Sequence, residues 1–344
     1  MKNVFYFAHI SSIGGVESMF YYLSKKYKDF TVVYEKADPE QIRRLAHNVE
    51  VVKFVGQKIK CDRFFCNYSF NILNYVEAKE YYHIVHCDYS KVSFNPILNE
   101  GFKYIGVSKL ACDSFKERAG KDIELIYNPI EIEKPKNVKK HNDGKIHILC
   151  ATRLSKEKGG ENIIKLAQMS DDFIIDVYSN RKLKNHLPNI IEHEPKLDLT
   201  KEMAEADYVC QLSKFEAFGL TPAEALILGT PVIVTDIPAF REIGCIHGKN
   251  AVICDENMKN VDIELIKKGL PPFTYTPPKE TWYKYLSKES DYNPKEKVKV
   301  RTRKNYFDVE LQEHFLRNKI IENKITKERA SYLEAKEIVE IIYD

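Results

Sequence analysis

The chain has 344 residues, of which 44% are hydrophobic and 30% charged, as is ordinary for a globular protein. The formal net charge is only +3, from 53 Lys and Arg against 50 Asp and Glu, so charge alone does not predict nucleic-acid binding. No stretch reaches the roughly 18 apolar residues of a membrane span, and no N-terminal signal peptide is recognised. The eight cysteines are scattered without a CxxC pair, which predicts reduced core residues in a cytosolic protein.

Strand-like and helical segments alternate through the first 130 residues. Helical periodicity predicts helices over 14–27 and 109–119. Apolar runs predict short buried strands at 4–9, 30–34, 49–55, 64–68, 83–87, 104–107 and 123–127. Buried strands separated by helices are typical of a parallel α/β sheet, so we expect a Rossmann-like domain over 1–130.

A polar segment without periodicity, 131–144, interrupts this series and predicts a linker. A second α/β series over 145–270 then predicts another Rossmann-like domain. Its strands are expected at 145–151, 173–177, 208–212, 231–235 and 251–254, and its helices at 159–169, 201–206, 222–228 and 261–268. Two such domains predict a cleft between them, with ligands at the carboxyl ends of the strands.

The end of the chain differs from both series. A crossing segment and charged linker are expected over 271–296, in which a short helix at 281–288, with the only tryptophan, packs back on the first domain. A small appended module follows over 297–344, with a helix at 327–335. The basic stretch 295–304 is interpreted either as a solvated linker or as a contact for DNA or an anionic membrane.

A basic loop follows the first strand of the second domain. Ala151-Thr-Arg-Leu-Ser-Lys-Glu-Lys-Gly-Gly160 places Arg153, Lys156 and Lys158 between that strand and a helix. Arginine binds phosphate oxygens through two parallel donors, and lysine is a compact point charge. The loop therefore predicts a diphosphate site, and a solvated basic loop is the alternative.

The segment Lys214-Phe-Glu-Ala-Phe-Gly-Leu-Thr-Pro-Ala-Glu-Ala-Leu226 places Glu216 and Glu224 on either side of a glycine turn. Thr221 is predicted as the N-cap of the next helix, with Pro222 first and Glu224 third, which is a capping box. The free N–H groups of such a helix suit a phosphate. Glu216, just outside the helix, can accept hydrogen bonds from hydroxyl groups.

Together these segments resemble the GT-B retaining glycosyltransferases of family 4. The resemblance rests on the order of Arg153-Leu-Ser-Lys-Glu-Lys-Gly-Gly160, Gln211-Leu-Ser213, the Glu216–Glu224 pair and Gly229-Thr-Pro-Val-Ile-Val-Thr-Asp236. Gly14-Gly15-Val16-Glu17 is similar to the family's glycine loop, and Tyr127-Asn128-Pro129-Ile130 to the segment that closes its first domain. The resemblance runs from residue 3 to residue 260 and implies a GT-B fold of two Rossmann-like domains facing across a cleft, here with the appended module.

The resemblance implies a role for each residue of the second domain's site. Arg153 and Lys158 would bind the donor diphosphate and stabilise it as it leaves. Glu216 would contact hydroxyls of the donor sugar, and Glu224 the ribose, although Glu224 alternatively only caps its helix. The intervening residues would line the donor: Ala217, Phe218, Gly219, Leu220 and Thr221.

Two positions in the first domain join this predicted site. Gly14 and Gly15 follow the first strand, where the missing Cβ lets backbone approach a ligand, unless the turn is only a tight turn. Their spacing is not GxGxxG, so a nicotinamide cofactor is not predicted. His86 ends an apolar strand and by resemblance would touch the donor sugar or the acceptor, with a structural histidine as the alternative. Asp88 beside it is a further candidate.

With these residues, the resemblance implies a metal-independent, retaining hexosyltransferase without a cofactor, which uses a nucleotide diphosphate-sugar of the UDP or GDP type. No carboxylate pair is placed for double displacement, so front-face attack assisted by the leaving phosphate is the expected route. Val177-Tyr-Ser-Asn180 replaces a Gly-x-Gly turn common in the family, with His193 expected beside the base, which leaves the base open. The alternatives are a GT-B epimerase or phosphorylase, and a sugar-nucleotide-binding module without transfer.

The acceptor is open from sequence alone. A hydroxyl of a glycan or lipid-linked glycan is expected, and no obligate protein partner is inferred. Residues 297–344 resemble small modules at the ends of phage or prophage proteins, and a phage setting adds a nucleic-acid base as an acceptor. A cytoplasmic location is expected, with peripheral contact at the inner membrane face or a phage-infected cell as settings.

Overall fold

The computed structural model describes residues 2–68, 70–184 and 187–343. By contacts between residues, the chain divides into two units. The first comprises Met1–Val85, Leu98–Ile105 and Thr281–Asp344, and the second comprises His86–Ile97 and Gly106–Glu280. The domain bounds expected from the sequence remain predictions, because the two units are defined by contacts and not by those bounds.

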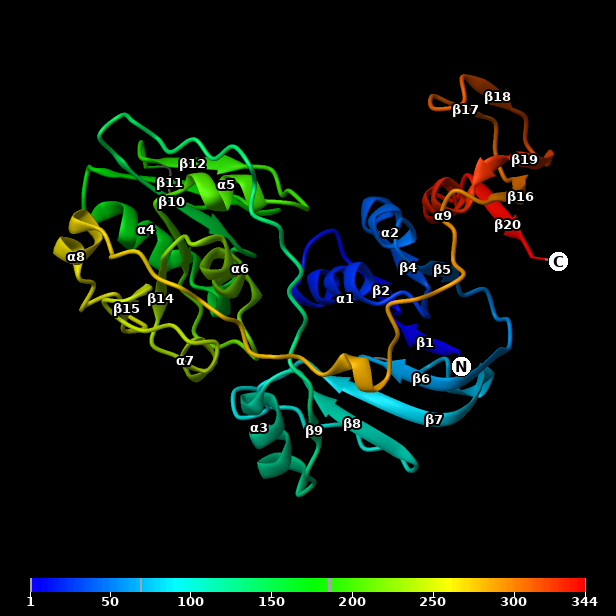
Figure 1. Ribbon diagram of the computed structural model, residues 1–344, viewed down its shortest axis with the longest axis horizontal. Coiled ribbons are helices and arrows are strands. Elements are labelled where there is room, and N and C mark those ends of the chain that lie inside the picture. Colours follow the sequence, from blue (N-terminus) through cyan, green and yellow to red (C-terminus); the bar gives the residue numbers. More distant parts are fainter. Residues whose placement is uncertain (1, 69, 185–186, 344) are drawn as a thin grey trace. The chain divides into compact units, whose positions relative to one another are not determined.

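A seven-stranded sheet has the order β5-β3-β1-β6-β7-β8-β9 (Figure 1). The strands are β1 (Asn3–Tyr6), β3 (Phe30–Tyr34), β5 (Glu50–Lys53), β6 (Ile59–Cys66), β7 (Val76–Val85), β8 (Phe102–Gly106) and β9 (Glu124–Leu125). β1 runs parallel to β3 and β6, β3 to β5, and β6 to β7. Two short strands, β2 (His9–Ile10) and β4 (Lys36–Ala37), form a separate parallel pair. The parallel α/β prediction is confirmed.

Helices connect these strands. α1 (Gly15–Lys26) and α3 (Lys109–Ala119) lie where helical periodicity predicts them. α2 (Pro39–Ala46) was not predicted, although Asp38 accepts hydrogen bonds from the first-turn N–H groups and proline stands at the first helical position. A 3-10 turn, η1 (Leu73–Tyr75), precedes β7. The first half of β7 pairs with β6 and alternates between half-buried and exposed residues, which explains its charged residues.

The second unit contains a six-stranded sheet of order β12-β11-β10-β13-β14-β15, with every pair parallel. In chain order this is the 3-2-1-4-5-6 arrangement of a Rossmann fold. The strands are β10 (Ile146–Ala151), β11 (Phe173–Tyr178), β12 (Ile190–His193), β13 (Tyr208–Gln211), β14 (Val232–Thr235) and β15 (Ala251–Cys254). The helices are η2 (Lys156–Lys158), α4 (Gly160–Gln168), α5 (Thr200–Glu205), α6 (Leu220–Leu228), α7 (Pro238–Glu242) and α8 (Ile263–Lys268).

The short helix expected near the tryptophan is the 3-10 turn η3 (Trp282–Lys284). The Trp282 ring is fully buried and lies 5.9 Å from Phe5 and 6.1 Å from Phe65, measured between ring centroids. Lys28 N also donates to Ser287 O at 2.9 Å. The prediction that this segment packs back on the first α/β series is confirmed.

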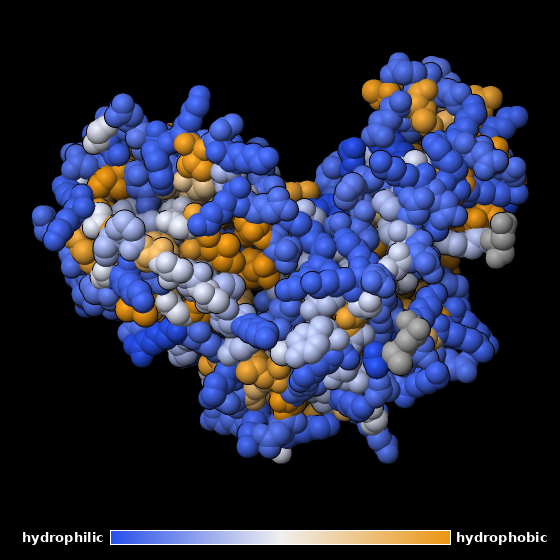
Figure 2. All heavy atoms as spheres, viewed as in Figure 1, coloured by the Kyte–Doolittle hydropathy of each residue, from blue (hydrophilic) through white to orange (hydrophobic). Residues whose placement is uncertain are grey.

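The C-terminal module has a core of its own. β16 (Lys297–Thr302) pairs antiparallel with β19 (Ile320–Thr326) and β20 (Val339–Ile342), beside a hairpin of β17 (Tyr306–Asp308) and β18 (Glu313–Phe315). α9 (Lys327–Ala335) has the predicted bounds and contacts α2, where Glu328 meets His47 at 3.2 Å. Figure 2 shows hydrophobic atoms among hydrophilic ones around β17 and β18, where Phe307, Val309 and Leu316 are exposed.

The cysteines and the helices bear on the cellular setting. All eight cysteines are free, and five of them are buried, as predicted for reduced core residues. Burial raises the pKa of several of these thiols, for example that of Cys245 to about 12, which makes them inert. None of the helices in the described ranges combines the length and the hydropathy that a bilayer crossing requires.

We expect Trp282→Ala to lower the free energy of unfolding by about 3–5 kcal/mol, because the ring fills a buried site between two phenylalanines. Tyr283→Ala is the matched control, since that neighbouring side chain is 61% exposed. Urea denaturation followed by circular dichroism measures both variants. Equal losses in the two variants would show that the tryptophan does not hold this segment in place.

Candidate functional site

The predicted site residues of the second unit gather where the strand order of the six-stranded sheet reverses. β10 and β13 are neighbours at this point, while the chain leaves them for opposite halves of the sheet. The loop after β10 carries Arg153 and Lys158, and the loop after β13 carries Glu216. In open parallel sheets, ligands bind outside the carboxyl ends of the strands at such a reversal. The sheet topology therefore brings the two predicted loops together.

An ion pair joins the two loops. Lys158 Nζ lies 2.6 Å from Glu216 Oε1, and each side chain is only 16% exposed. Ser213 Oγ donates to the same Oε1 at 2.8 Å, and Gln211 Nε2 lies 3.4 Å from it and 2.6 Å from Ser213 Oγ. Among the described residues, no hydrogen bond is found to Glu216 Oε2. Oε1 thus makes all the contacts that the described residues show for this carboxylate.

The sequence analysis did not assign Gln211 and Ser213 a role in holding Glu216. Gln211 is the last residue of β13 and Ser213 follows two residues later, with Gln211 Nε2 donating to Ser213 Oγ at 2.6 Å. Ser213 is fully buried, and Thr235 Oγ1 donates to its carbonyl oxygen. The alternation of polar side chains at the end of an apolar strand was the signal that could have identified them.

Close backbone packing places Lys158. Gly159 has φ +74°, and a Cβ there would lie 1.9 Å from Leu212 O, so only glycine fits. Lys214 N also donates to Glu157 O at 2.8 Å. These contacts hold η2 against the end of β13 and direct Lys158 toward Glu216.

α6 begins two residues earlier than predicted, so the capping-box prediction is wrong. Its N-cap is Gly219, with φ +98° and no side-chain cap, and Leu220 is the first helical residue. Pro222 is then third, where its missing N–H still costs no helical hydrogen bond. Gly219 can take this conformation, whereas a Cβ would meet the Phe240 ring at 2.9 Å. The N–H groups of the first turn still belong to the predicted donor segment.

The other predicted residues of this unit differ in exposure. Arg153 is exposed, and no ion pair of its guanidinium is found within the described ranges. Glu224 lies in α6 and is buried, with a polar partner. Phe218 is buried and its ring lies 6.1 Å from that of Tyr127, whereas Ala217 and Thr221 are half-buried. Farther along the sheet, the His193 and Tyr178 rings stack at 4.5 Å.

His86 directly follows β7 and is half-buried, with an interaction of its own. Asp88 is buried and its Oδ1 accepts from Ser90 N at 3.0 Å and from Ser90 Oγ at 2.6 Å, which forms a local turn. This geometry gives Asp88 a structural role. His86 stays a predicted site residue.

The glycine loop belongs to the first unit. Gly15 begins α1, and Gly14 precedes it with an extended backbone. A Cβ on Gly14 would lie 2.1 Å from Glu17 Oε2, and Glu17 Oε1 accepts from Ser11 N at 2.8 Å. In this structure, Gly14 makes room for a buried carboxylate that holds its own loop.

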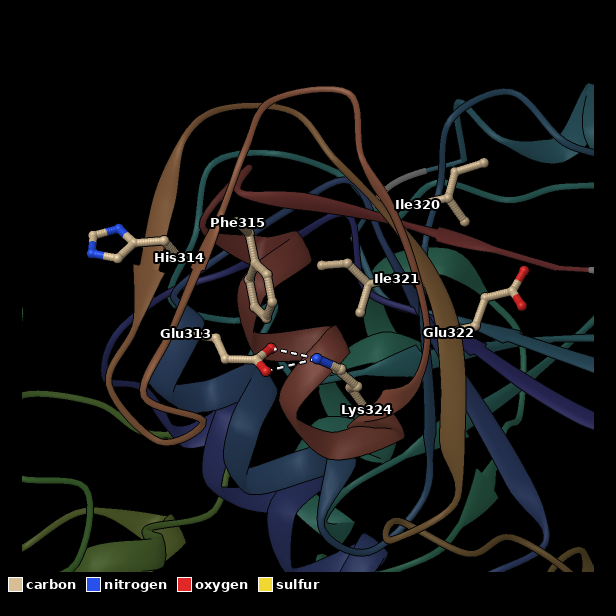
Figure 3. A pocket seen from close by; sticks show the side chains of 7 residues that line it. All are labelled: Glu313, His314, Phe315, Ile320, Ile321, Glu322 and Lys324. Carbon is tan, nitrogen blue, oxygen red and sulfur yellow. Dashed lines mark hydrogen bonds and ion pairs between the residues drawn. The ribbon is translucent and has the colours of Figure 1, made fainter.

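A pocket in the C-terminal module contains none of the predicted site residues. It lies between β18 and β19, with Phe315 and Ile321 among its walls (Figure 3). The Lys324 ammonium bridges both oxygens of Glu313 across it, at 2.6 and 2.9 Å. Lys324 and Glu313, which line this pocket, are therefore paired with each other.

Residues 131–270 match the family model of Glycosyl transferases group 1. The match includes the loop after β10 and the loop after β13, which carry the motifs of the sequence resemblance. An uncharacterized glycosyltransferase, MJ1069, of Methanocaldococcus jannaschii is 29% identical over 173 residues, which are 44% of this chain and 43% of the relative. An uncharacterized 41.2 kDa protein in the cps region of Klebsiella pneumoniae is 29% identical over 141 residues, 35% of this chain and 38% of the relative. The chain thus spans about two fifths of these relatives.

Solved structures show the fold. Anabaena Alr3699/HepE in complex with UDP and glucose superposes with a TM-score of 0.61 at 16% identity, over 78% of this chain and 89% of that one. WaaG, a glycosyltransferase involved in lipopolysaccharide biosynthesis, gives a TM-score of 0.53 at 12% identity, over 78% and 89% of the two chains. These superpositions confirm the predicted GT-B fold.

We expect Gly159→Ala to destabilise the protein, because the left-handed conformation alone costs a non-glycine residue about 1–2 kcal/mol and the new Cβ would overlap Leu212 O. Gly160→Ala is the matched control, since its Cβ would meet Leu154 Cα at an ordinary 3.6 Å. Thermal unfolding measures both variants. A Gly159→Ala protein as stable as the control would mean that η2 does not pack on β13 in this way.

Proposed function

We propose that the chain is a retaining glycosyltransferase that moves a sugar from a nucleotide diphosphate-sugar to an acceptor hydroxyl. The observation that carries the proposal is the Lys158–Glu216 pair at the strand-order reversal, beside the start of α6. A cation for phosphate, a carboxylate for hydroxyls and helical N–H groups for an anion meet in one part of one unit. The Glycosyl transferases group 1 match over the same residues supports this assignment.

Charge development in the reaction gives each residue its role. Breaking the anomeric bond places negative charge on the leaving diphosphate, which Arg153, Lys158 and the first turn of α6 would stabilise. Glu216 would accept hydrogen bonds from sugar hydroxyls through Oε2, because Oε1 is already engaged. Glu224 would contact the ribose. Since no second carboxylate is assigned for double displacement, we propose front-face attack assisted by the leaving phosphate.

The resting ion pair distinguishes the two cations. A diphosphate must compete with Glu216 for Lys158, whose Nζ lies 2.6 Å from Glu216 Oε1. The exposed Arg153 forms no ion pair among the described residues, although its charge contributes to lowering the pKa of Glu157. We propose that Arg153 meets the donor first and that Lys158 then exchanges one anionic partner for another. Lys158 would thus remain neutralised throughout, which avoids an unpaired charge in a half-buried place.

The proposal also specifies the type of donor, the cellular location and the acceptor. HepE binds UDP, glucose and UDP-glucose in its structures, which supports a UDP-type donor ahead of a GDP-type one. The free cysteines support a cytoplasmic location. We propose a glycan or lipid-linked hydroxyl as acceptor rather than a DNA base. In the basic stretch, Lys299 pairs with Glu322 at 2.7 Å and Arg303 with Glu340 at 3.6 Å, which leaves less charge for a nucleic acid.

We expect Arg153→Ala and Lys158→Ala each to lower the transfer rate about 10²–10³-fold, because each removes a fixed positive charge from the leaving diphosphate. Lys156→Ala is the matched control, since this exposed lysine of the same loop is assigned no donor contact. A thermal-shift screen of nucleoside diphosphates and their sugars selects the donor for the assay. Full activity in both variants would end the diphosphate assignment. Donor turnover without an acceptor separates an enzyme from a binding module.

We expect transfer to proceed at an unchanged rate in the presence of EDTA, because protein cations take the role that a divalent metal has in other transferases. The measurement is the initial rate before and after dialysis against the chelator, with added Mg²⁺ and Mn²⁺ as the comparison. An absolute requirement for either ion would contradict the metal-independent part of the proposal.

A further inference from the structure

A carboxylate of α7 binds the start of α3, 132 and 133 residues earlier in the chain. Glu242 Oε1 accepts from Lys109 N at 2.6 Å, and Glu242 Oε2 accepts from Leu110 N at 3.0 Å. Ser108 Oγ takes the next N–H, that of Ala111, at 2.9 Å. The first turn of α3 is therefore satisfied partly by its own N-cap and partly by another element of the same unit.

The local electrostatics favour this contact. A carboxylate at a helix N-terminus meets two backbone donors and the positive end of the helix dipole. Burial and the negative charge of Glu242 together raise the pKa of Tyr127 to about 12, which places that ring in the neighbourhood of the same carboxylate. Tyr127 in turn lies against Phe218 of the donor segment.

α3 also anchors the segment that begins with His86. Ser114 Oγ of α3 accepts from Tyr89 N at 3.1 Å. Arg118 Nη2 donates to Tyr89 O at 2.7 Å and to Val92 O at 3.1 Å. Residues 86–97 accordingly belong by contacts to the unit that contains α3 and the six-stranded sheet.

α7 also packs against the donor segment 217–221. A Cβ on Gly219 would lie 2.9 Å from the Phe240 ring and 3.5 Å from Ile243, so the backbone at the start of α6 rests directly on α7 and the residue after it. One five-residue helix thus contacts the donor segment through Phe240 and α3 through Glu242.

From this chain of contacts we propose that Glu242 is a positioning residue, which fixes the His86 segment relative to the donor segment 217–221 by clamping α3 to α7. The inference rests on the proposed function for its catalytic consequence. Glu242 does not act on the donor itself. Losing it would displace His86 while leaving Arg153, Lys158 and Glu216 in place.

The test is a double-mutant cycle with Glu242→Gln and His86→Ala. Glutamine keeps one oxygen but turns an amide N–H₂ toward a backbone N–H, so the clamp opens without a large change in volume. We expect Glu242→Gln to lower kcat about 10²-fold, the loss typical of a displacement of about 1 Å, while the dissociation constant for UDP changes less than about twofold. In the His86→Ala background, Glu242→Gln should have almost no further effect, because the group it positions is gone.

Asp113→Asn is the matched control, since Asp113 pairs with Lys109 at 2.7 Å on the surface of the same helix and does not cap it. This variant should keep its kcat. Hydrogen exchange followed by mass spectrometry gives a readout that needs no turnover. Exchange over residues 86–97 and the first turn of α3 should accelerate in Glu242→Gln and not in Asp113→Asn.

The outcomes separate the two proposals. If the wild type turns over no sugar nucleotide, the proposed function fails, and the exchange data still decide whether Glu242 holds the 86–97 segment. If the wild type is active but the rate losses of the two single variants multiply in the double variant, Glu242 does not act through His86. Unchanged exchange over 86–97 in Glu242→Gln would overturn the inference whatever the activity.

Discussion

One ion pair, between Lys158 and Glu216, determines how the two loops at the strand-order reversal are arranged. Each partner is only 16% exposed, and a charge in such a place is costly unless it is paired. Neither side chain would be stable there with the other absent and nothing in its place. Gly159, Gln211 and Ser213 support this geometry, in which Lys158 Nζ and Glu216 Oε1 lie 2.6 Å apart.

The same arrangement leaves the carboxylate with hydrogen-bond donors when its lysine partner turns away. Ser213 and Gln211 approach the oxygen that Lys158 contacts, so Glu216 keeps neutral donors on Oε1 when the ammonium turns toward another anion. Under the proposed function, Lys158 binds the diphosphate and Glu216 binds the sugar, so neither side chain has to do both. Lysine can change partners during a catalytic cycle while the carboxylate keeps its orientation toward the sugar.

Local sequence signals predicted much of this fold. α3, α9, β3 and β15 have the expected bounds because their periodicity or apolar runs end at clear breaks such as Gly120 and Asp255. The start of α6 was misplaced because Thr221 and Pro222 form a capping pattern, whereas the tertiary contact of Gly219 with Phe240 selects an earlier cap. β12 and the charged first half of β7 carried no strand signal, since β12 is an edge strand and the first half of β7 alternates between half-buried and exposed residues.

Contacts between distant segments could not be predicted in this way. Glu242 has an ordinary helical context, and nothing near it in sequence indicates that its carboxylate binds the start of α3. By contacts, residues 86–97 and the region of α3 group with the six-stranded sheet although they precede the linker. Sequence order placed His86 with the first α/β series. Contacts group it instead with the residues proposed to bind the donor, and this is the arrangement that a group acting at the anomeric carbon would need.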